Sequence, residues 1–336
     1  MSQYVGIDLH RRRSQVVILD ETGVKLSSVK VENSPAALAL AVGEAGPAPE
    51  VVLEATWGWY WAAELLTDMG ARVHLAHPLG IKGYQNRRVK NDERDATLLA
   101  ELLRVGSLPE GWIAPSELRE TRELVRYRHK LSRLRAGLKS QIHAVLGKEG
   151  VIPDLKTLWG PAGSDWLDNQ NLAEAYQHRV VSLRRLIGRY DIEVSELDRR
   201  IHARLADHTG YQVIQQLDGV GPVLAAVFVA EIGDISRFPT PKRLTSWAGL
   251  TPRHRESDTT IHRGPITKQG SALLRWAAVE AVARYRGGAP IRDTYQRVAA
   301  RKGNKVARVA AARKLLTLIY YGIRDGEIRC LNKEAA

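Results

Sequence analysis

Four acidic residues occupy positions where a carboxylate needs a partner. Asp8 ends one apolar strand-like segment and Glu54 ends another, while Asp92 and Asp95 stand three residues apart at the start of a predicted helix. Each acid alone has a commoner structural explanation, and Asp92 also suits an ordinary helix N-terminus. As a set they predict an oxygen-rich site for Mg²⁺ or Mn²⁺, because carboxylates at the ends of buried strands are costly without a counter-charge. Such sites serve phosphodiester chemistry.

A serine stands in a strongly basic segment near residue 257. A solvent-facing bystander is the commoner explanation for one serine, but arginines can stabilise a negatively charged phosphorane and a histidine can accept a hydroxyl proton. We therefore treat Ser257 as a candidate nucleophile and its basic neighbours as candidate nucleic-acid contacts. The candidate contacts are Arg253, Arg255, Arg263 and Lys268, and His254 is the histidine that could accept the proton.

Glycines mark the segment 217–222, which reads Leu-Asp-Gly-Val-Gly-Pro. Gly219 and Gly221 would let backbone N–H groups approach a phosphate without side chains in the way. The segment predicts a helix-hairpin-helix motif that binds nucleic acid. A tight connection between two helices, with no ligand, is the plain alternative.

The first 115 residues have the order of an α/β domain. Three strands joined by short turns precede alternating helices and strands, which predicts a mixed sheet. The predicted strands are 4–8, 14–19, 25–31, 50–54 and 72–75, and the predicted helices are 35–42, 60–69 and 92–105.

The remaining residues predict helices. Apolar residues recur at steps of three and four between Leu124 and Val145 and between Val180 and Leu205, with a Pro/Gly-marked break between them. This pattern is typical of a helical hairpin or coiled coil. We predict three domains, an α/β domain over 1–115, the coiled-coil segment over 116–208 and a mostly α-helical domain with the helix-hairpin-helix over 209–330.

Charge separates the two ends of the chain. The 336 residues carry a net charge of +13, yet residues 1–115 hold 12 Lys and Arg against 14 Asp and Glu. The rest holds 38 against 23, which favours a polyanionic partner. The stretch 284–314 has ten basic residues and one acid, and we expect its Arg301, Lys302 and Lys305 to contact nucleic acid.

Composition excludes several other classes. Hydrophobic residues make up 44% of the chain, which excludes disorder throughout. No apolar run approaches the roughly 18 residues of a membrane span, and no signal peptide is visible. The single cysteine, Cys330, cannot form an internal disulfide. We expect a protein of the reducing cytoplasm without a membrane partner.

Together these motifs resemble the DEDD transposases of bacterial insertion sequences, relatives of the Piv DNA invertases. Gly6-Ile7-Asp8, Glu54-Ala55-Thr56, Lys90-x-Asp92-x-x-Asp95-Ala96, the Gly-Val-Gly turn and Gly249–Arg253 with Ser257 occur in order over nearly the whole chain. The resemblance implies a RuvC/RNase H-like N-terminal domain whose acids Asp8, Glu54, Asp92 and Asp95 bind metal. It also implies Ser257 as nucleophile. The family often has glycine after that serine, where this chain has Asp258.

The resemblance further implies a site-specific recombinase that joins donor and target double-stranded DNA. It implies guidance by a structured bridge RNA and a phosphoserine intermediate. A RuvC-like structure-selective nuclease that uses only the four acids is the alternative, and a covalent protein–DNA adduct distinguishes the two. A sugar kinase or actin-like ATPase would need a Gly/Thr-rich phosphate loop after Asp8, where this chain has Leu-His-Arg-Arg-Arg. The four acids argue against a non-catalytic binder.

The two apolar stripes are longer than a nuclease core requires, so we expect part of them to pack against another protomer. Recombination joins two duplexes, which favours a homodimer that pairs into a tetramer on nucleic acid. No carboxylate cluster lies near Ser257 in the sequence. We therefore expect the acidic domain of the same or a neighbouring protomer to supply the metal.

Overall fold

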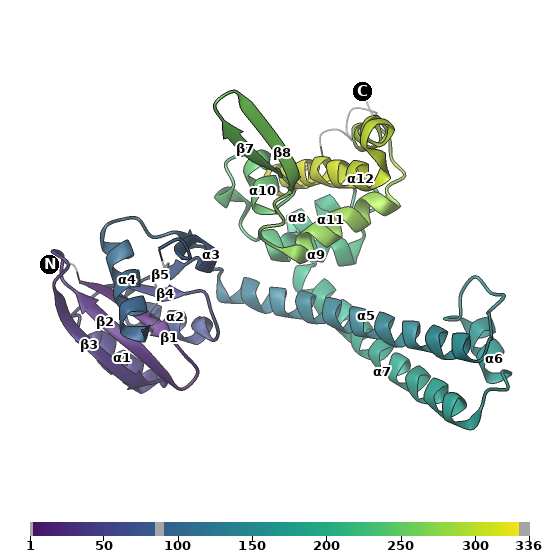
Figure 1. The fold of residues 1–336 in the computed structure, drawn as a ribbon, viewed down its shortest axis with the longest axis horizontal. Coiled ribbons are helices and arrows are strands. Elements are labelled where there is room, and N and C mark those ends of the chain that lie inside the picture. Colours follow the sequence, from purple (N-terminus) through teal and green to yellow (C-terminus); the bar gives the residue numbers. More distant parts are fainter. Residues whose placement is uncertain (1–2, 85–90, 329–336) are drawn as a thin grey trace. The chain divides into compact units, whose positions relative to one another are not determined.

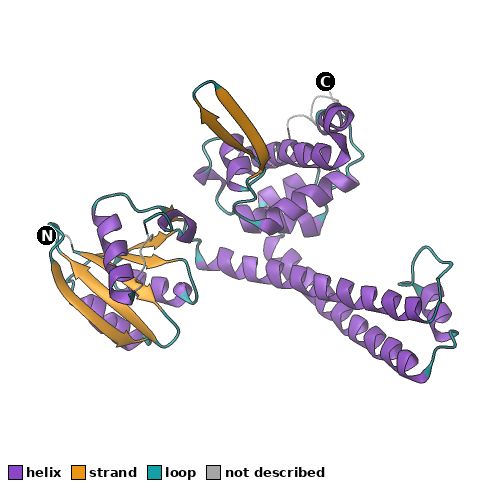
Figure 2. Cartoon of the chain, viewed as in Figure 1, coloured by secondary structure: helices purple, strands orange, loops and turns teal. Residues whose placement is uncertain are grey.

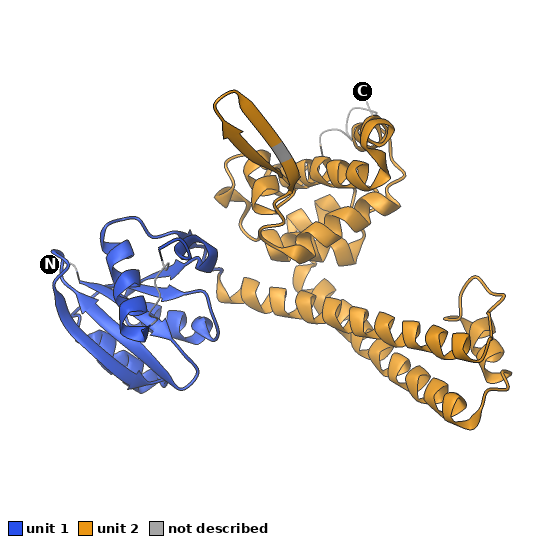
Figure 3. Ribbon diagram, in the orientation of Figure 1, with its two compact units in different colours: residues 1–114 blue, residues 115–336 orange. Residues whose placement is uncertain are grey.

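A computed structural model describes residues 3–84 and 91–328, apart from the side chain of Arg263. Lys90 and Cys330 therefore lie outside the described residues. The chain forms two compact units, residues 1–114 and residues 115–336 (Figure 3). The first contains the large sheet and the second is mainly helical (Figures 1 and 2). The mixed α/β N-terminal domain and the helical C-terminal region are thus confirmed.

The first unit is built on a six-stranded mixed sheet with the strand order β3-β2-β1-β4-β5-β6. β1 pairs antiparallel with β2 and parallel with β4. The strands are β1 (Tyr4–Leu9), β2 (Arg13–Leu19), β3 (Lys25–Glu32), β4 (Glu50–Glu54), β5 (Arg72–Ala76) and β6 (Glu110–Gly111). The helices are α1 (Pro35–Gly43), α2 (Trp59–Asp68), α3 (Pro78–Ile81) and α4 (Asp92–Arg104). Every predicted element is present within two residues, whereas α3 and β6 were not predicted.

The two faces of this sheet have separate cores. Val5, Ile7 and Leu53 pack with residues of α1 and α2. On the opposite face, Val17 and Leu19 of β2 pack with two alanines of α4, and Val52 packs with leucines of the same helix. Strand alternation explains this division, since successive side chains of β1 and β4 point to opposite faces. The first unit is therefore a three-layer structure in which α4 covers one face of β1.

Gly6 allows α4 to approach β1 closely. A Cβ atom at this position would lie 1.9 Å from the carbonyl oxygen of Ala96 and 2.8 Å from the amide nitrogen of Ala100. Both are helix backbone atoms, which cannot rotate away as a flexible side chain can. The glycine thus fixes the distance between the strand that carries Asp8 and the helix that carries Asp92 and Asp95.

We expect Gly6→Ala to lower the free energy of unfolding by about 1–3 kcal/mol, the usual cost of overpacking a tight interior. Thermal or urea unfolding measures the change. Gly43→Ala is the matched control, because no atom lies within 4 Å of the added Cβ and its backbone needs no positive φ. Equal stability of the Gly6→Ala protein and the wild type would show that α4 can move away without cost.

The second unit starts with two long helices that run along each other. The ion pairs Arg128–Asp198, Arg135–Asp191 and Arg204–Glu120 show an antiparallel register, since the sequence number rises on one helix as it falls on the other. The elements are α5 (Ser116–Lys148), α6 (Pro161–Asp168), α7 (Glu174–Leu205), α8 (Thr209–Ile214), α9 (Pro222–Ile232), η1 (Ile235–Arg237), α10 (Pro241–Trp247), β7 (Pro252–Ser257), β8 (Thr260–Ile266), α11 (Ala272–Arg284) and α12 (Ile291–Asp325).

The apolar stripe of α5 is only partly covered by α7. Leu131, Ile142 and Val145 are buried, but Tyr127 and Leu134 remain 45% and 44% exposed. Val125 is buried, although the predicted stripe contains its neighbour Leu124 and continues to Tyr127 without it. This part of α5 contacts α9 as well as α7, so a different side of the helix is buried here.

Two features of the second unit were not foreseen. The strands β7 and β8 form a hairpin in a region to which the sequence assigned no element. The basic helix α12 is broken at Gly303, whose φ of 77° and ψ of 167° are not helical. In the described part of the chain, no helix is both long and apolar enough to cross a membrane.

Candidate active site

Asp8 and Glu54 come from neighbouring parallel strands and from the same sheet face. Ile7 lies opposite Leu53 in the β1–β4 register, so Asp8 and Glu54 each follow a paired residue by one position. They share the face of Gly6 and Val52, which is the face that α4 covers. Asp8 is 9% exposed, and Glu54 is partly buried.

The N-terminus of α4 supplies the other two acids. The side chain of Asn91 caps the helix by accepting a hydrogen bond from the Glu93 amide, with an N–O distance of 3.1 Å. Asp92 and Asp95 lie in the first turn, where the helix dipole favours negative charge. The cap therefore fixes the residue at which α4 begins, and with it the position of Asp92 and Asp95 in the first turn.

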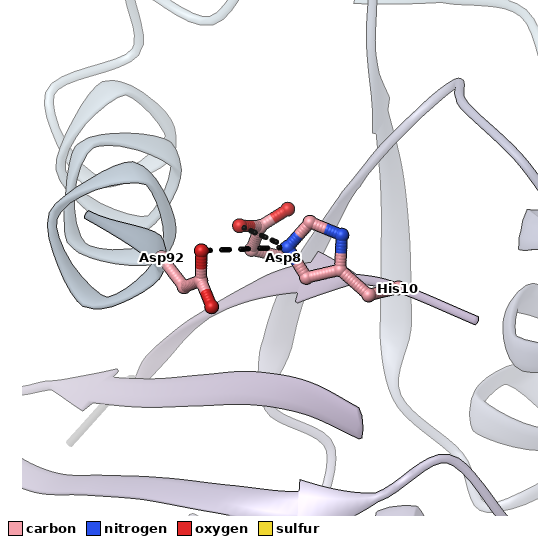
Figure 4. Close-up of side chains that lie close together, drawn as sticks. All are labelled: Asp8, His10 and Asp92. Atoms are coloured by element: carbon pink, nitrogen blue, oxygen red, sulfur yellow. Dashed lines mark hydrogen bonds and ion pairs between the residues drawn. The ribbon is translucent and has the colours of Figure 1, made fainter. Parts of the chain in front are cut away.

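His10 lies between two of these carboxylates (Figure 4). Its Nε2 atom is 3.1 Å from Oδ2 of Asp8 and 3.6 Å from Oδ1 of Asp92. One potential ligand atom from each of the three residues falls within 4.8 Å of the others. The structure thus brings Asp8 and Asp92 together, although they are far apart in the sequence.

The charges of this cluster act on one another. Burial is the main cause that raises the pKa of Asp8 above its ordinary value; the charge of His10 opposes this, and the charges of Asp92 and Asp95 add to it. A hydrogen bond from Lys30, with an N–O distance of 2.9 Å, is the main cause that lowers the pKa of Asp92. A divalent cation would offset the repulsion between these carboxylates, and oxygen ligands of this kind suit it.

The predicted set of four acids is brought together only in part. The charge of Asp95 acts on Asp8, and Glu54 lies on the same sheet face as Asp8 by strand register. Neither residue is part of the cluster of Asp8, His10 and Asp92. His10 was not predicted as a site residue. Its position two residues after Asp8, where the strand ends, was the one available signal. The acidic site fits a divalent metal ion through its carboxylate oxygens.

Ser257 lies at the tip of the β7–β8 hairpin. It pairs with Thr260 across a two-residue turn of Asp258 and Thr259, and every residue of β7 is exposed. Asp258 has a φ of 52°, a left-handed conformation that glycine adopts without strain and aspartate tolerates. Among the residues that the structure describes, the Ser257 hydroxyl has no hydrogen-bond partner.

Strand alternation separates Ser257 from the histidine that the sequence placed beside it. His254 is three residues before Ser257 and hydrogen-bonds Glu256, with an Nε2–Oε2 distance of 3.1 Å. Residues three apart on a strand point to opposite faces, which argues against His254 as a base for Ser257. His262 pairs with Arg255 and therefore shares the face of Ser257. The sequence did not single out His262.

The two glycines of the predicted helix-hairpin-helix serve different purposes. Gly219 has a φ of 78°, and a Cβ there would lie 2.3 Å from the Ala281 carbonyl oxygen of α11. Its conformation and packing require glycine. Gly221 precedes α9 and would have no atom within 4 Å of an added Cβ. Of these two glycines, only Gly221 leaves open space next to a helix N-terminus.

The remaining predicted contacts are exposed basic residues. Arg301, Lys302 and Lys305 flank the break at Gly303 and form no ion pair within the described residues. Arg253, Arg255 and Lys268 are also exposed, and the side chain of Arg263 lies outside the description.

Two family models match this chain. A transposase model, that of the DEDD transposases of IS110 elements, matches residues 5–149. A model described as the transposase IS116/IS110/IS902 family matches residues 211–296. The first spans the sheet with its acidic cluster, and the second spans the Gly219–Gly221 turn and the β7–β8 hairpin.

Individual relatives agree with these models. The protein y4qE of Sinorhizobium fredii, to which a transposase role is ascribed, is 27% identical over 84% of this chain and 72% of its own length. The transposase for insertion sequence element IS1111A of Coxiella burnetii is 24% identical over 81% and 74%. The pilin gene-inverting protein of Moraxella bovis is 27% identical over 82% and 80%.

These matches place the chain among DNA strand-transfer enzymes. It belongs to the DEDD transposase family of IS110/IS116 insertion sequences, and it is a transposase that binds DNA.

Proposed function

We propose that this transposase cuts and rejoins donor and target DNA site-specifically through a phosphoserine intermediate and is guided by a structured bridge RNA. The observation that carries the proposal is the acidic cluster between β1 and α4, together with a separate exposed serine. Asp8, Asp92 and Asp95, with Glu54, would hold Mg²⁺ or Mn²⁺. When bound, the ion supplies charge stabilisation at the reacting phosphate.

The serine step conserves the phosphodiester bond energy. The Oγ atom of Ser257 attacks a DNA phosphate, an O–P bond to the serine forms, and the bond to one strand oxygen breaks. The hydroxyl proton ends on the oxygen that leaves. A hydroxyl of another strand then attacks the serine phosphoester, and its proton returns to Ser257, so strand exchange needs no outside energy source.

The arrangement of charge supports a nucleic-acid partner for the second unit. Residues 116–336 carry the whole positive surplus of the chain. We assign 1–115 to a RuvC-like nuclease domain, 116–208 to a coiled-coil segment and 209–330 to the domain with the serine and the helix-hairpin-helix. A homodimer that pairs into a tetramer in the bacterial cytoplasm, on the nucleoid, completes the proposal.

A structure-selective nuclease without a covalent intermediate is the second candidate. The observation that favours it is that Asp8, His10 and Asp92 form their cluster from residues of the first unit alone. Such an enzyme would release cut strands with free ends and would not rejoin them.

Purification of the protein from cells that carry its whole insertion element tests the guidance. We expect sequencing of the bound RNA to identify one discrete species from the element, with segments complementary to donor and target. Removal of that RNA should stop recombination, and its return should restore it. Full recombination by RNA-free protein would contradict guidance, yet leave the phosphoserine mechanism standing.

The two glycines allow a matched test of nucleic-acid contact. We expect Gly221→Ala to weaken duplex binding several-fold without loss of stability, because the added methyl group obstructs a phosphate at the start of α9 but touches nothing in the protein. Gly219→Ala should instead lower the melting temperature, since its Cβ meets helix backbone. Fluorescence anisotropy and thermal unfolding measure the two effects. Wild-type affinity in Gly221→Ala would assign this turn a purely structural purpose.

A further inference from the structure

An aromatic pair on the second unit is not used by the proposed chemistry. His129 of α5 and Trp276 of α11 contact each other with ring centroids 4.4 Å apart and an interplanar angle of 55°. Trp276 is 36% exposed, although most large apolar side chains of this unit are buried. An indole held at the surface against a second ring offers a flat face to a ligand.

Two hollows meet at this pair. One is a cavity of about 420 Å³ between α5, α7 and α9, with Val125, Ile201, Tyr211 and Ala226 in its mostly apolar wall. The other, of about 740 Å³, is lined by Ser132, Glu280, the arginines 128, 133, 135 and 284 and apolar residues of α5, α9 and α11. His129 and Trp276 line both. The smaller volume falls within the range of about 300–1,000 Å³ that is usual for small-molecule sites.

The charge around the second hollow is positive. Arg128 and Arg135 pair with Asp198 and Asp191, and Glu280 lies 3.7 Å from Arg284. Arg133 has no carboxylate within salt-bridge distance in the described part of the chain, and it is exposed. Burial lowers the pKa of His129, helped by the charges of Arg133 and Arg128, which favours the neutral ring.

The occupant must therefore combine a flat apolar group with negative charge. An apolar peptide segment would leave Arg133 without a counter-charge. An unpaired nucleotide satisfies both requirements, because its base stacks on an aromatic ring and its phosphates contact guanidinium groups. Pro222 and Val223 at the start of α9 also line the smaller hollow, which places it next to the open space at Gly221.

We propose that the hollow at His129 and Trp276 binds an unpaired nucleobase, which stacks on Trp276 while its strand passes over Arg133. The site requires only a single-stranded segment and does not depend on whether an RNA guides the enzyme. Stacking tolerates any base, so a homopolymer is an adequate probe.

The test measures binding of the full chain to labelled oligothymidylate, oligouridylate and an abasic deoxyribose-phosphate strand of equal length. We expect Trp276→Leu to weaken binding of at least one base-containing strand by about fivefold to 100-fold, the effect of losing one base stack. Binding of the abasic strand should not change. Loss of affinity for oligothymidylate alone assigns the base to DNA, loss for oligouridylate alone assigns it to RNA, and loss for both shows that the hollow accepts a base from either.

Matched variants separate stacking from other effects. Trp276→Phe should retain most of the affinity because it keeps a ring, and Trp57→Leu, which removes another exposed tryptophan in the first unit, should bind all strands like wild type. Arg133→Gln should weaken all three strands alike and lower the salt dependence by about one charge. An unchanged ratio of base-containing to abasic binding in Trp276→Leu would overturn the proposal. If Trp276→Leu changes the oligomeric state but leaves the ratio of base-containing to abasic binding unchanged, the proposal is also overturned. The hollow would then be a contact with a second copy of the chain.

Discussion

An Asp8→Asn protein is expected to bind DNA like the wild type and to cleave it at least about 10²- to 10³-fold more slowly, the range for loss of one preorganised electrostatic group. The substitution keeps the shape of the side chain but removes a charged oxygen from the cluster with Asp92. The basic surfaces of the second unit are untouched, so affinity for DNA should not change. Single-turnover cleavage with Mg²⁺ or Mn²⁺ and a parallel binding titration measure the two quantities.

Stability provides an independent check of this assignment. Because the pKa of Asp8 is raised, the folded state holds its proton more tightly than the unfolded state, and ionisation at pH 7 costs stability. Without metal, Asp8→Asn should therefore melt at the same temperature as the wild type or higher. Added Mg²⁺ should raise the melting temperature of the wild type but have much less effect on the variant.

Asp68→Asn is the matched control, since it removes an exposed acid at the end of α2 in the same unit. It should cleave DNA and respond to Mg²⁺ like the wild type. Undiminished cleavage by Asp8→Asn would show that the acids between β1 and α4 do not form the metal site.

The sheet of the first unit could be predicted because its physical pattern is local. β4 is an unbroken apolar run between two acids, and its bounds, 50–54, agree with the prediction. The close approach of β1 and α4 was not predictable. It depends on what lies opposite Gly6, and the sequence does not show that a helix backbone does.

The sequence of the β7–β8 hairpin has no apolar strand pattern of this kind. All six residues of β7 are exposed, so neither face has an apolar period of two. Its turn residues, Asp258 and Thr259, also lack the Asn-Gly or Asp-Gly signal of a tight hairpin. The basic neighbours of Ser257 could therefore be recognised in the sequence. The strand β7, whose alternation places the Ser257 and His254 side chains on opposite faces, could not.

The acidic site shows the same limit. Strand ends and a helix start predicted where Asp8 and Asp92 lie, because both positions follow from secondary structure. The contact of His10 with both of them depends on how the chain leaves β1, a tertiary detail. Likewise, Gly219 and Gly221 are equivalent in the sequence, and the backbone conformation of Gly219 and its contact with α11 distinguish them.

A Ser257→Ala protein is expected to bind RNA and DNA normally, yet to form no covalent adduct and no recombinant DNA. The hydroxyl lies at the exposed tip of a hairpin, and its loss removes no described hydrogen bond, so folding should not be affected. Without Oγ, no serine phosphoester can form and the bond energy of a cut strand cannot be retained. Denaturing gels of end-labelled DNA with the wild type and the variant measure the adduct, and a recombination assay measures the product.

Thr259→Ala is the matched control, because Thr259 carries the other hydroxyl that lies in the two-residue turn next to Ser257. It should form adduct and recombinant at wild-type levels. An adduct that persists in Ser257→Ala and disappears in Thr259→Ala would assign the nucleophile to the threonine. Free cut ends without any adduct in the wild type, at every time point, would instead favour the nuclease, because hydrolysis at the acidic cluster needs no hydroxyl from the hairpin.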